Sequence, residues 1–261
     1  MNPVELVKKF KATILLTILL LLSYFLLSSG EIYIPDATLS SFSFSLSQPL
    51  NIIFYNFIHT GLFHLIVNLS SLIIFALIVE SVLGSRDVLA IFFFASILAA
   101  ITFVAINPDT ALIGSSAGIS GLLGAGMILK TKRAFAAAVV ISILFGIVIA
   151  PALHSFITAY ADDLKRSKQD ADLDLNRAID AGNIYKIPDL NKAAEQINEN
   201  QQKFKKGREN ELEIKTDPFI HGYAAGYGII FLWLFRRKKF WAGIREFHGF
   251  LDGLTAKIRR R

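Results

Sequence analysis

Several serines and histidines lie in otherwise apolar stretches of this chain, where their chemistry is unusual. The run LIGSSAGISGLLGAGMILK, residues 112–130, contains Ser115, Ser116 and Ser120. Histidines occur in FIHTGLFHLIVNLSS, with His59, His64 and also Asn68, and in DPFIHGYAAGYGIIF, with His221. A serine beside an imidazole is a sufficient nucleophile, because the imidazole takes up the hydroxyl proton during attack on a carbonyl. These residue types therefore predict acyl-transfer chemistry if the fold brings a serine and a histidine together.

Each of these residues also has a simpler structural explanation when it is taken alone. A serine in a membrane helix usually donates a hydrogen bond to its own helix. His64 and Asn68 lie one turn apart on one helix face, and an interhelical hydrogen bond would explain the pair without catalysis. Polar groups inside a bilayer are costly, however. Their joint occurrence in apolar segments therefore favours a functional site.

Composition places the chain among all-α membrane proteins. Of 261 residues 53 % are hydrophobic and 18 % are charged, and the mean hydropathy is +0.50. A helix needs about 20 residues to cross the hydrocarbon core. Uncharged stretches of sufficient length predict six spans, at 12–30, about 59–80, 88–108, 110–129, 134–161 and 218–235. Residues 1–30 have some features of a cleavable signal peptide, but the apolar stretch is long for one, so we expect a retained helix.

The basic residues predict the orientation of these spans. Six spans put both termini on one side, and 16 lysines and arginines fall on that side. The segment 155–217 on the opposite side carries 11 basic and 13 acidic residues. The positive-inside rule therefore places both termini in the cytoplasm, with the protein in the plasma membrane. The net charge of +6 is explained by this topology, so nucleic acid is not an expected partner.

The same pattern divides the chain into four parts. We expect a membrane core with five helices at 1–154, a charged extracytoplasmic insert at 155–217, a sixth helix at 218–236 and a cytoplasmic tail at 237–261. In the insert, a helix is expected from Pro188-Asp189 onward and another over about 162–181, with a solvated loop as the alternative. The tail is expected to be a basic amphipathic helix at the membrane interface, with one apolar face formed by Phe240, Ile244, Phe247, Leu251, Leu254 and Ile258.

Depth along the helices favours Ser116 over Ser120. Ser116 lies 14 residues before Lys130, about 21 Å along a helix, and His221 lies 15 residues before Arg236, about 22 Å. Ser120 is only about 15 Å above Lys130, too deep to meet His221 in straight helices. Small residues should allow the two helices to approach closely, namely Gly114, Gly118, Gly121 and Gly124 on one and Gly222, Ala225, Gly226 and Gly228 on the other.

Other chemistries fit the sequence less well. The chain has no cysteine, so thiolate chemistry is excluded. It lacks a His-Glu-x-x-His zinc motif, and no predicted span contains an aspartate. A secondary transporter stays open as an alternative, although we find no internal repeat and no intramembrane carboxylate for ion coupling.

Four motifs resemble those of the rhomboid family of intramembrane serine proteases. HTGLFHLIVN is similar to the family's His-x4-His-x3-Asn pattern, and ESVLGSRDVL to its Glu and Leu-Gly-Ser run. GSSAGISGLLGA resembles the nucleophile segment, and HGYAAGYG the sixth-helix histidine with its small residues. The resemblance covers about residues 50–150 and 217–235. It implies a six-helix bundle with Ser116 as nucleophile, His221 as general base, and His64 and Asn68 at the oxyanion. It also implies transmembrane proteins as substrates and no metal or cofactor.

The sequence departs from the family pattern in several places. Ala117 follows Ser116 where the family usually has glycine, and Gly-x-Ser-Gly occurs literally at residues 118–121, so Ser120 stays open as the nucleophile. The first outer loop is short, so its embedded helices are expected to be reduced. The insert at 155–217 has no family counterpart, and we expect it to control access or to dock substrates. A non-cleaving rhomboid-like protein that binds membrane clients is the alternative function.

Overall fold

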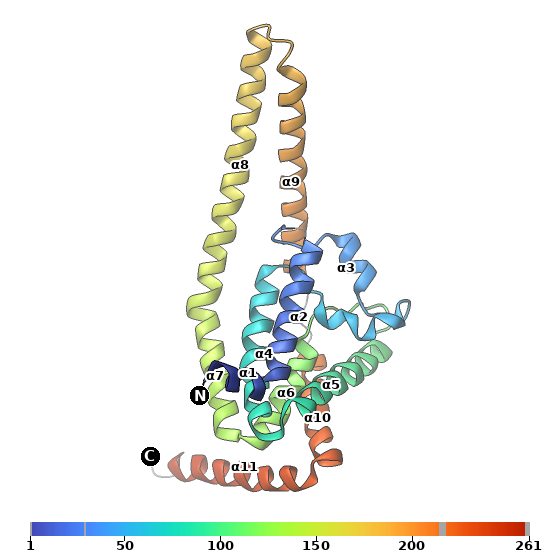
Figure 1. The fold of residues 1–261 in the computed structure, drawn as a ribbon, viewed down its shortest axis with the longest axis vertical. Helices are drawn as coiled ribbons and strands as arrows, with labels where there is room; N and C mark the ends of the chain where they lie inside the picture. The colour runs from blue at the N-terminus through green and yellow to red at the C-terminus, as the bar shows by residue number, and fades with distance from the viewer. Residues whose placement is uncertain (1, 29, 214–217, 259–261) are drawn as a thin grey trace.

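The computed structural model describes residues 2–28, 30–213 and 218–258. Helices form nearly all of its regular structure (Figure 1). Within these ranges the extended pairings are two isolated β-bridges, Tyr33 with Gly61 and Phe44 with Leu112. The predicted all-α fold is confirmed.

Among the described residues, five helical segments are long and apolar enough to cross a membrane. They are α2 (Lys11–Ser28), α4 (Leu62–Leu83), α5 (Ser85–Ile106), the continuous segment Thr131–Asp180 and α10 (Pro218–Phe235). A further apolar helix, α6 (Ser116–Leu129), has 14 residues. Each of these six segments overlaps one of the six predicted stretches. The chain is an integral, multi-pass membrane protein.

Helix α6 is short because the chain before it is held in an extended form. At about 21 Å it is shorter than the roughly 30 Å hydrocarbon core. Leu112 N–H donates to the Phe44 carbonyl at 2.8 Å, and Gly114 N–H donates to the Tyr55 carbonyl at 2.8 Å. These bonds replace the helical bonds expected over 110–115. The chain therefore enters the bundle as a loop, and the helix begins only at Ser116.

Helix α6 lies at the centre of the bundle, in contact with α4, α5 and α10 (Figure 1). Its residues Ile119, Leu122 and Ala125 belong to the main hydrophobic core, which also includes Leu72 and Phe92. The surrounding helices thus fix α6 from several sides, and its first turn is held with them.

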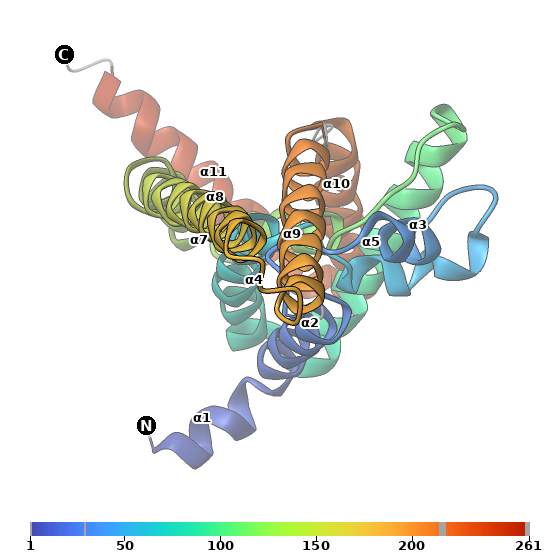
Figure 2. The same ribbon diagram turned by 90° about the horizontal axis from the view of Figure 1, so that it is seen from above.

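The segment between α2 and α4 extends to one side of the bundle (Figure 2). It contains α3 (Asp36–Phe42) and two 3-10 turns, η1 (Pro49–Ile52) and η2 (Phe54–Phe57). Ile34 N–H donates to the Thr60 carbonyl at 2.9 Å, and Leu62 N–H donates to the Ile32 carbonyl at 3.1 Å. The expectation of reduced helices in this loop is confirmed. Its extended part is fixed directly above the start of α4.

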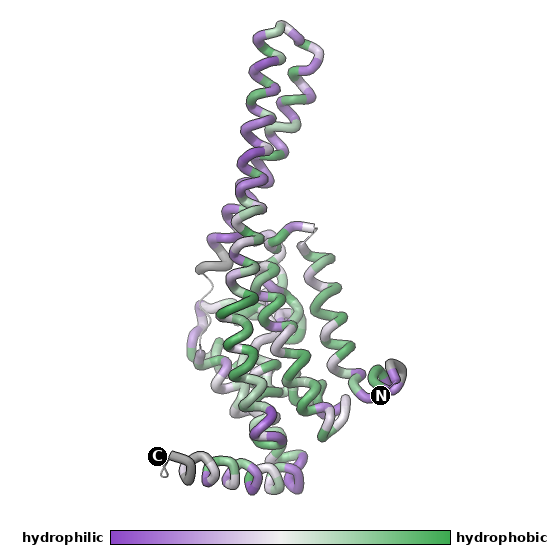
Figure 3. Tube along the Cα trace, turned by 90° about the vertical axis from the view of Figure 1, so that its left-hand side faces the viewer, coloured by the Kyte–Doolittle hydropathy of each residue, from purple (hydrophilic) through white to green (hydrophobic). Residues whose placement is uncertain are grey.

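The predicted fifth span continues without a break into the predicted insert. α7 (Thr131–Leu144), a π-helical turn η3 (Phe145–Ile149) and α8 (Ala150–Asp180) form one rod of 50 residues. Pro151 has no N–H to donate four residues back, which accounts for the altered turn just before it. The predicted boundary between the membrane core and the insert, at residues 154 and 155, therefore lies inside one continuous helix. Figure 3 shows the change from apolar to polar residues along this rod.

The outer part of α8 pairs with α9 (Ile187–Glu213) in a long hairpin (Figure 1). The turn uses Gly182 at φ 63°, and Asn183 N–H donates to the Ala178 carbonyl at 2.9 Å. The helix predicted over 162–181 is thus the end of α8, and α9 begins beside the predicted Pro188-Asp189 start. The alternative of a solvated loop was wrong.

Helices α1 (Pro3–Lys9) and α11 (Arg237–Ile258) lie at the end opposite the hairpin (Figure 1). α11 runs across the bundle and contacts α6, where the Gly243 position closely approaches the Ile128 carbonyl. The predicted tail helix is therefore confirmed. Of the residues named for its apolar face, the side chains of Leu254 and Ile258 lie outside the described part.

Two carboxylates tie helices together at this same end. Glu80 of α4 accepts hydrogen bonds from the N–H groups of Ala12 and Thr13, at 2.8 and 3.0 Å, and from the Thr13 hydroxyl. Asp87 of α5 accepts two hydrogen bonds from Arg236 after α10, at 2.7 and 2.5 Å. These bonds and the Asp87 charge raise the pKa of the Arg236 guanidinium. α2 and α10 are thereby fixed to the ends of α4 and α5.

Candidate active site

The first turn of α6 offers unpaired N–H groups to a developing negative charge. Ser115 is the N-cap residue and Ser116 the first helical residue. Ile119 N–H donates to the Ser115 carbonyl at 3.0 Å, so the N–H groups of the first turn precede the first intrahelical bond. They lie at the positive end of the helix dipole. This is a suitable environment for an oxyanion formed during attack by Ser116.

Burial separates the three serines. Ser115 has 0 % exposure, whereas Ser116 and Ser120 are partly exposed. The partly exposed residues of α6 are Ser116, Ser120, Leu123 and Met127, at spacings of four, three and four. This spacing puts them on one helix face. A substrate approaching that face can therefore reach Ser116 and Ser120, but not Ser115.

An adjacent side of α6, about 90° around the helix from this exposed face, packs closely against α10, and glycine makes this contact feasible. A Cβ atom at Gly124 would lie 2.2 Å from the Ala225 carbonyl oxygen, and one at Gly228 would lie 2.0 Å from the Gly121 carbonyl oxygen. The prediction of a close helix contact is confirmed here. It was wrong for Gly222 and Gly226, which face open space, and for Gly114 and Gly118, which approach His64 and Phe92 instead of α10.

This contact sets the level of Ser116 relative to His221. Ala117, Ile220 and Ala224 belong to one buried cluster. Since Ala117 follows Ser116 and Ile220 precedes His221, the two candidate residues lie at the same level of neighbouring helices. Within the described ranges, the Ser116 hydroxyl makes no hydrogen bond. Catalytic hydrogen bonds commonly tighten only in the substrate complex.

His64 lies near the level of Ser116 and His221, next to the loop that leads into α6. A Cβ atom at Gly114 would be 2.9 Å from His64 Cε1, so the imidazole sits directly against the backbone before Ser115. Its Nδ1 lies 3.3 Å from the Thr60 hydroxyl. It also lies within electrostatic range of the His221 imidazole. The structure therefore gathers His64, His221 and the start of α6 in one region.

Gly114 is required at its position for two reasons. Its φ is +99°, a conformation that side chains rarely adopt, and the His64 ring leaves no space for a Cβ atom. The loop can consequently pass close to the His64 imidazole just before α6 begins at Ser116.

Asn68 lies one turn beyond His64 on α4 and is 4 % exposed. Its Nδ2 donates to the His64 carbonyl at 3.0 Å. The amide group carries a second N–H donor. Asn68 is thus on the same helix face as His64, and one of its donors is used within its own helix.

A second serine–histidine pair was missed by the sequence reasoning. His59 Nε2 lies 3.3 Å from the Ser115 hydroxyl, and the His59 and His64 rings make an edge contact at 5.0 Å. On one helix a five-residue spacing would put His59 and His64 on different faces, but α4 begins only at Leu62. His59 and Ser115 each have 0 % exposure, which makes them unsuitable as a nucleophilic pair. Instead, His59 packs against the His64 ring, and Ser115 is the N-cap residue of α6. The pair therefore stabilises both groups from the buried side.

No group of three or more His, Asp or Glu residues suited to a metal ion occurs within the described ranges. The gathered groups are a serine hydroxyl, imidazoles and helix N–H groups, which together suit general-base-assisted acyl transfer.

Comparison with known proteins connects most of this region to one family. Residues 46–164 match the family model for the Rhomboid domain. The match includes His64, Asn68 and Ser116 and ends at the base of the α8–α9 hairpin, before His221. No curated protein and no solved structure matches the chain.

Proposed function

Because the chain belongs to the rhomboid family through the domain at residues 46–164, we propose that it is an intramembrane serine endopeptidase. It would cleave peptide bonds in or next to transmembrane segments of other membrane proteins. The observation that carries the proposal is the position of Ser116. It is the first residue of a short central helix, on that helix's partly exposed face and at the level of His221.

The proposed reaction uses a Ser–His dyad. Ser116 Oγ attacks the carbonyl carbon of the scissile bond, and His221 accepts the hydroxyl proton. The N–H groups of the first α6 turn, assisted by His64 and Asn68, stabilise the oxyanion. His221 then donates its proton to the departing amine, which leaves an ester on Ser116. Water activated by the same imidazole hydrolyses this ester.

We also propose that both termini are cytoplasmic and that the protein resides in the plasma membrane. The hairpin then lies outside the cell, and α1 and α11 lie at the inner surface. The strongly polar hairpin at one end and the basic α11 at the other support this orientation (Figure 3).

The alternative function is binding of membrane clients without cleavage. Retention of both Ser116 and His221 favours the active enzyme. Ser120 is the alternative nucleophile, because it shares the partly exposed face of α6. It lies one turn further from the helix N-terminus, however, where no unpaired N–H groups remain.

Cleavage of a transmembrane reporter in liposomes tests these assignments. We expect Ser116→Ala and His221→Ala each to lower kcat/KM by about 10³-fold or more, with Ser120→Ala close to wild type. A fluorophosphonate should label wild type and Ser120→Ala but not Ser116→Ala. Neither cleavage nor labelling of wild type would support the client-binding alternative. Loss of labelling in Ser120→Ala alone would transfer the nucleophile to Ser120.

A further inference from the structure

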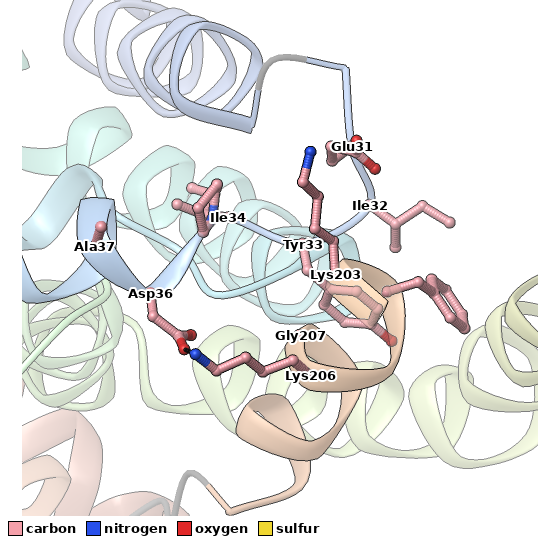
Figure 4. Close-up of a pocket in the computed structure, with 11 residues that line it drawn as sticks. Glu31, Ile32, Tyr33, Ile34, Asp36, Ala37, Lys203, Lys206 and Gly207 are labelled. Carbon is pink, nitrogen blue, oxygen red and sulfur yellow. Dashed lines mark ion pairs between the residues drawn. The ribbon is translucent and has the colours of Figure 1, made fainter. Parts of the chain in front are cut away.

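The base of α9 rests on the loop that follows α2, and a pocket lies between them (Figure 4). We call the α9 residues Lys203–Gly207 the hairpin foot. The ring of Phe204 lies 5.5 Å from that of Tyr33 and 5.3 Å from that of Tyr160. A Cβ atom at Gly207 would lie 2.4 Å from Tyr33 Cβ, so glycine permits this close seating. The foot is therefore packed in a defined position.

An ion pair reinforces this seating. Lys206 Nζ lies 2.6 Å from Asp36 Oδ2, the first residue of α3 (Figure 4). The side chains of both residues are partly exposed, at 69 % and 38 %. The ion pair joins the two walls at one edge of the pocket and leaves the rest of the pocket open.

The pocket encloses about 230 Å³ and combines apolar walls with a charged rim. Ile32, Ile34, Pro35 and Phe204 contribute apolar surface. Glu31 and Lys203 both belong to its charged rim (Figure 4). No ion pair is found for either within the described residues. The pocket thus offers space for an apolar side chain beside one available charge of each sign.

The pocket wall is connected directly to the candidate active site. Ile34 bonds to Thr60, which adjoins His59, and His59 contacts Ser115. The pocket wall and the start of α6 are thus linked through one hydrogen-bonded loop, which places both at the same end of the bundle.

We propose that this pocket binds the extracytoplasmic, membrane-proximal segment of the substrate. One large apolar side chain fills the pocket, and charged residues flanking it interact with Glu31 and Lys203. This inference rests on the proposed protease function. Four charged side chains around the pocket, Glu31, Asp36, Lys203 and Lys206, favour such a mixed peptide over a lipid acyl chain.

Charge reversal at the rim tests the proposal. The reporters are transmembrane proteins with leucine or alanine at the outer anchor position, flanked by lysine or by glutamate. Lys203→Glu makes the rim acidic, so KM for the lysine-flanked leucine reporter should fall about 5-fold relative to the glutamate-flanked one. Glu31→Lys should reverse this preference. The matched control is Lys205→Glu, a neighbouring exposed residue that does not line the pocket.

The apolar contact is tested separately. Ala37 lines the pocket and is exposed, so Ala37→Trp should fill the space without disturbing the core. This variant should lose the preference of wild type for leucine over alanine at the anchor. Fluorophosphonate labelling of Ser116 should stay unchanged in all rim and pocket variants.

The outcomes distinguish this inference from the function on which it rests. If wild type cuts the reporters and the rim variants change KM no more than Lys205→Glu does, the pocket proposal is overturned. If cleavage depends on the lipid composition and not on the flanking charges, it is overturned in favour of a lipid site. If wild type neither cuts nor reacts with the probe, the protease function itself fails.

Discussion

The Ser115 hydroxyl lies 3.3 Å from Nε2 of His59, and neither residue is exposed. The adjacent Ser116 is partly exposed and begins α6. Two consecutive serines therefore have different environments. One is sealed behind the site with a histidine partner, and the other faces the side from which a substrate can approach.

Ser115→Ala should reduce stability without removing the nucleophile. The substitution leaves a buried imidazole nitrogen without its partner, at a cost of about 1–3 kcal/mol. We expect a lower melting temperature in detergent and continued fluorophosphonate labelling, in contrast to Ser116→Ala. Unchanged melting together with lost labelling would identify Ser115 as the nucleophile and contradict our assignment.

The contact between α6 and α10 should be sensitive to a single methyl group. In Gly228→Ala the new Cβ would meet the Gly121 carbonyl oxygen at 2.0 Å, so α10 must shift and carry His221 away from Ser116. We expect kcat to fall at least about 10²-fold, since misplacement by about 1 Å has effects of this size. Gly226→Ala is the control on the same helix, because open space surrounds that position. Equal activity of the two variants would show that the contact does not position the dyad.

His64→Ala and Asn68→Ala should separate turnover from binding. If these side chains stabilise the oxyanion, each substitution should lower kcat about 10²–10³-fold and change KM little. Steady-state cleavage of the liposome reporter measures both constants. A rise in KM at constant kcat would instead assign the residue to substrate binding. Melting curves must accompany Asn68→Ala, since it also removes a bond to the His64 carbonyl.

Glu80→Gln should destabilise the bundle far from the site. The Glu80 carboxylate is 3 % exposed and accepts bonds from two backbone N–H groups and one hydroxyl at the start of α2. An amide has one acceptor oxygen, so part of this cap is lost, at about 1.5–3 kcal/mol. Thermal unfolding in detergent measures the change. Ser81→Ala, next in sequence but exposed and bonded within its own helix, should leave the melting temperature unaltered.

The sequence was sufficient to predict features that depend on local pattern. Apolar length predicted the six segments, and glycine spacing predicted the contact through Gly121, Gly124 and Gly228. The late start of α6 was not predictable, because it depends on bonds from Leu112 and Gly114 to Phe44 and Tyr55, far away in the chain. The assignments of Ser116, His221, His64 and Asn68 remain predictions until the variants are measured.

The pairing of His59 with Ser115 was missed for a related reason. A continuous helix over residues 59–64 would separate the two histidines, whereas the chain there is irregular until Leu62. The extension of α8 was also hidden, since the change to charged residues near position 162 resembles a helix end. Polarity marks where a helix leaves the membrane, and helix propensity decides where it stops.

The unbroken rod from Thr131 to Asp180 has a mechanical consequence. No flexible linker separates the apolar, membrane-spanning part of the rod from its polar part in the hairpin. A force on the hairpin tip is therefore transmitted as torque to the membrane-spanning part. α8 is 31 residues long. A tilt of about 10° at the η3 turn therefore displaces the tip by about 8 Å, given a rise of about 1.5 Å per residue. A small tilt of the membrane segment therefore gives a large displacement of the hairpin tip. Conversely, a large displacement of the tip gives only a small movement of the segment beside α6.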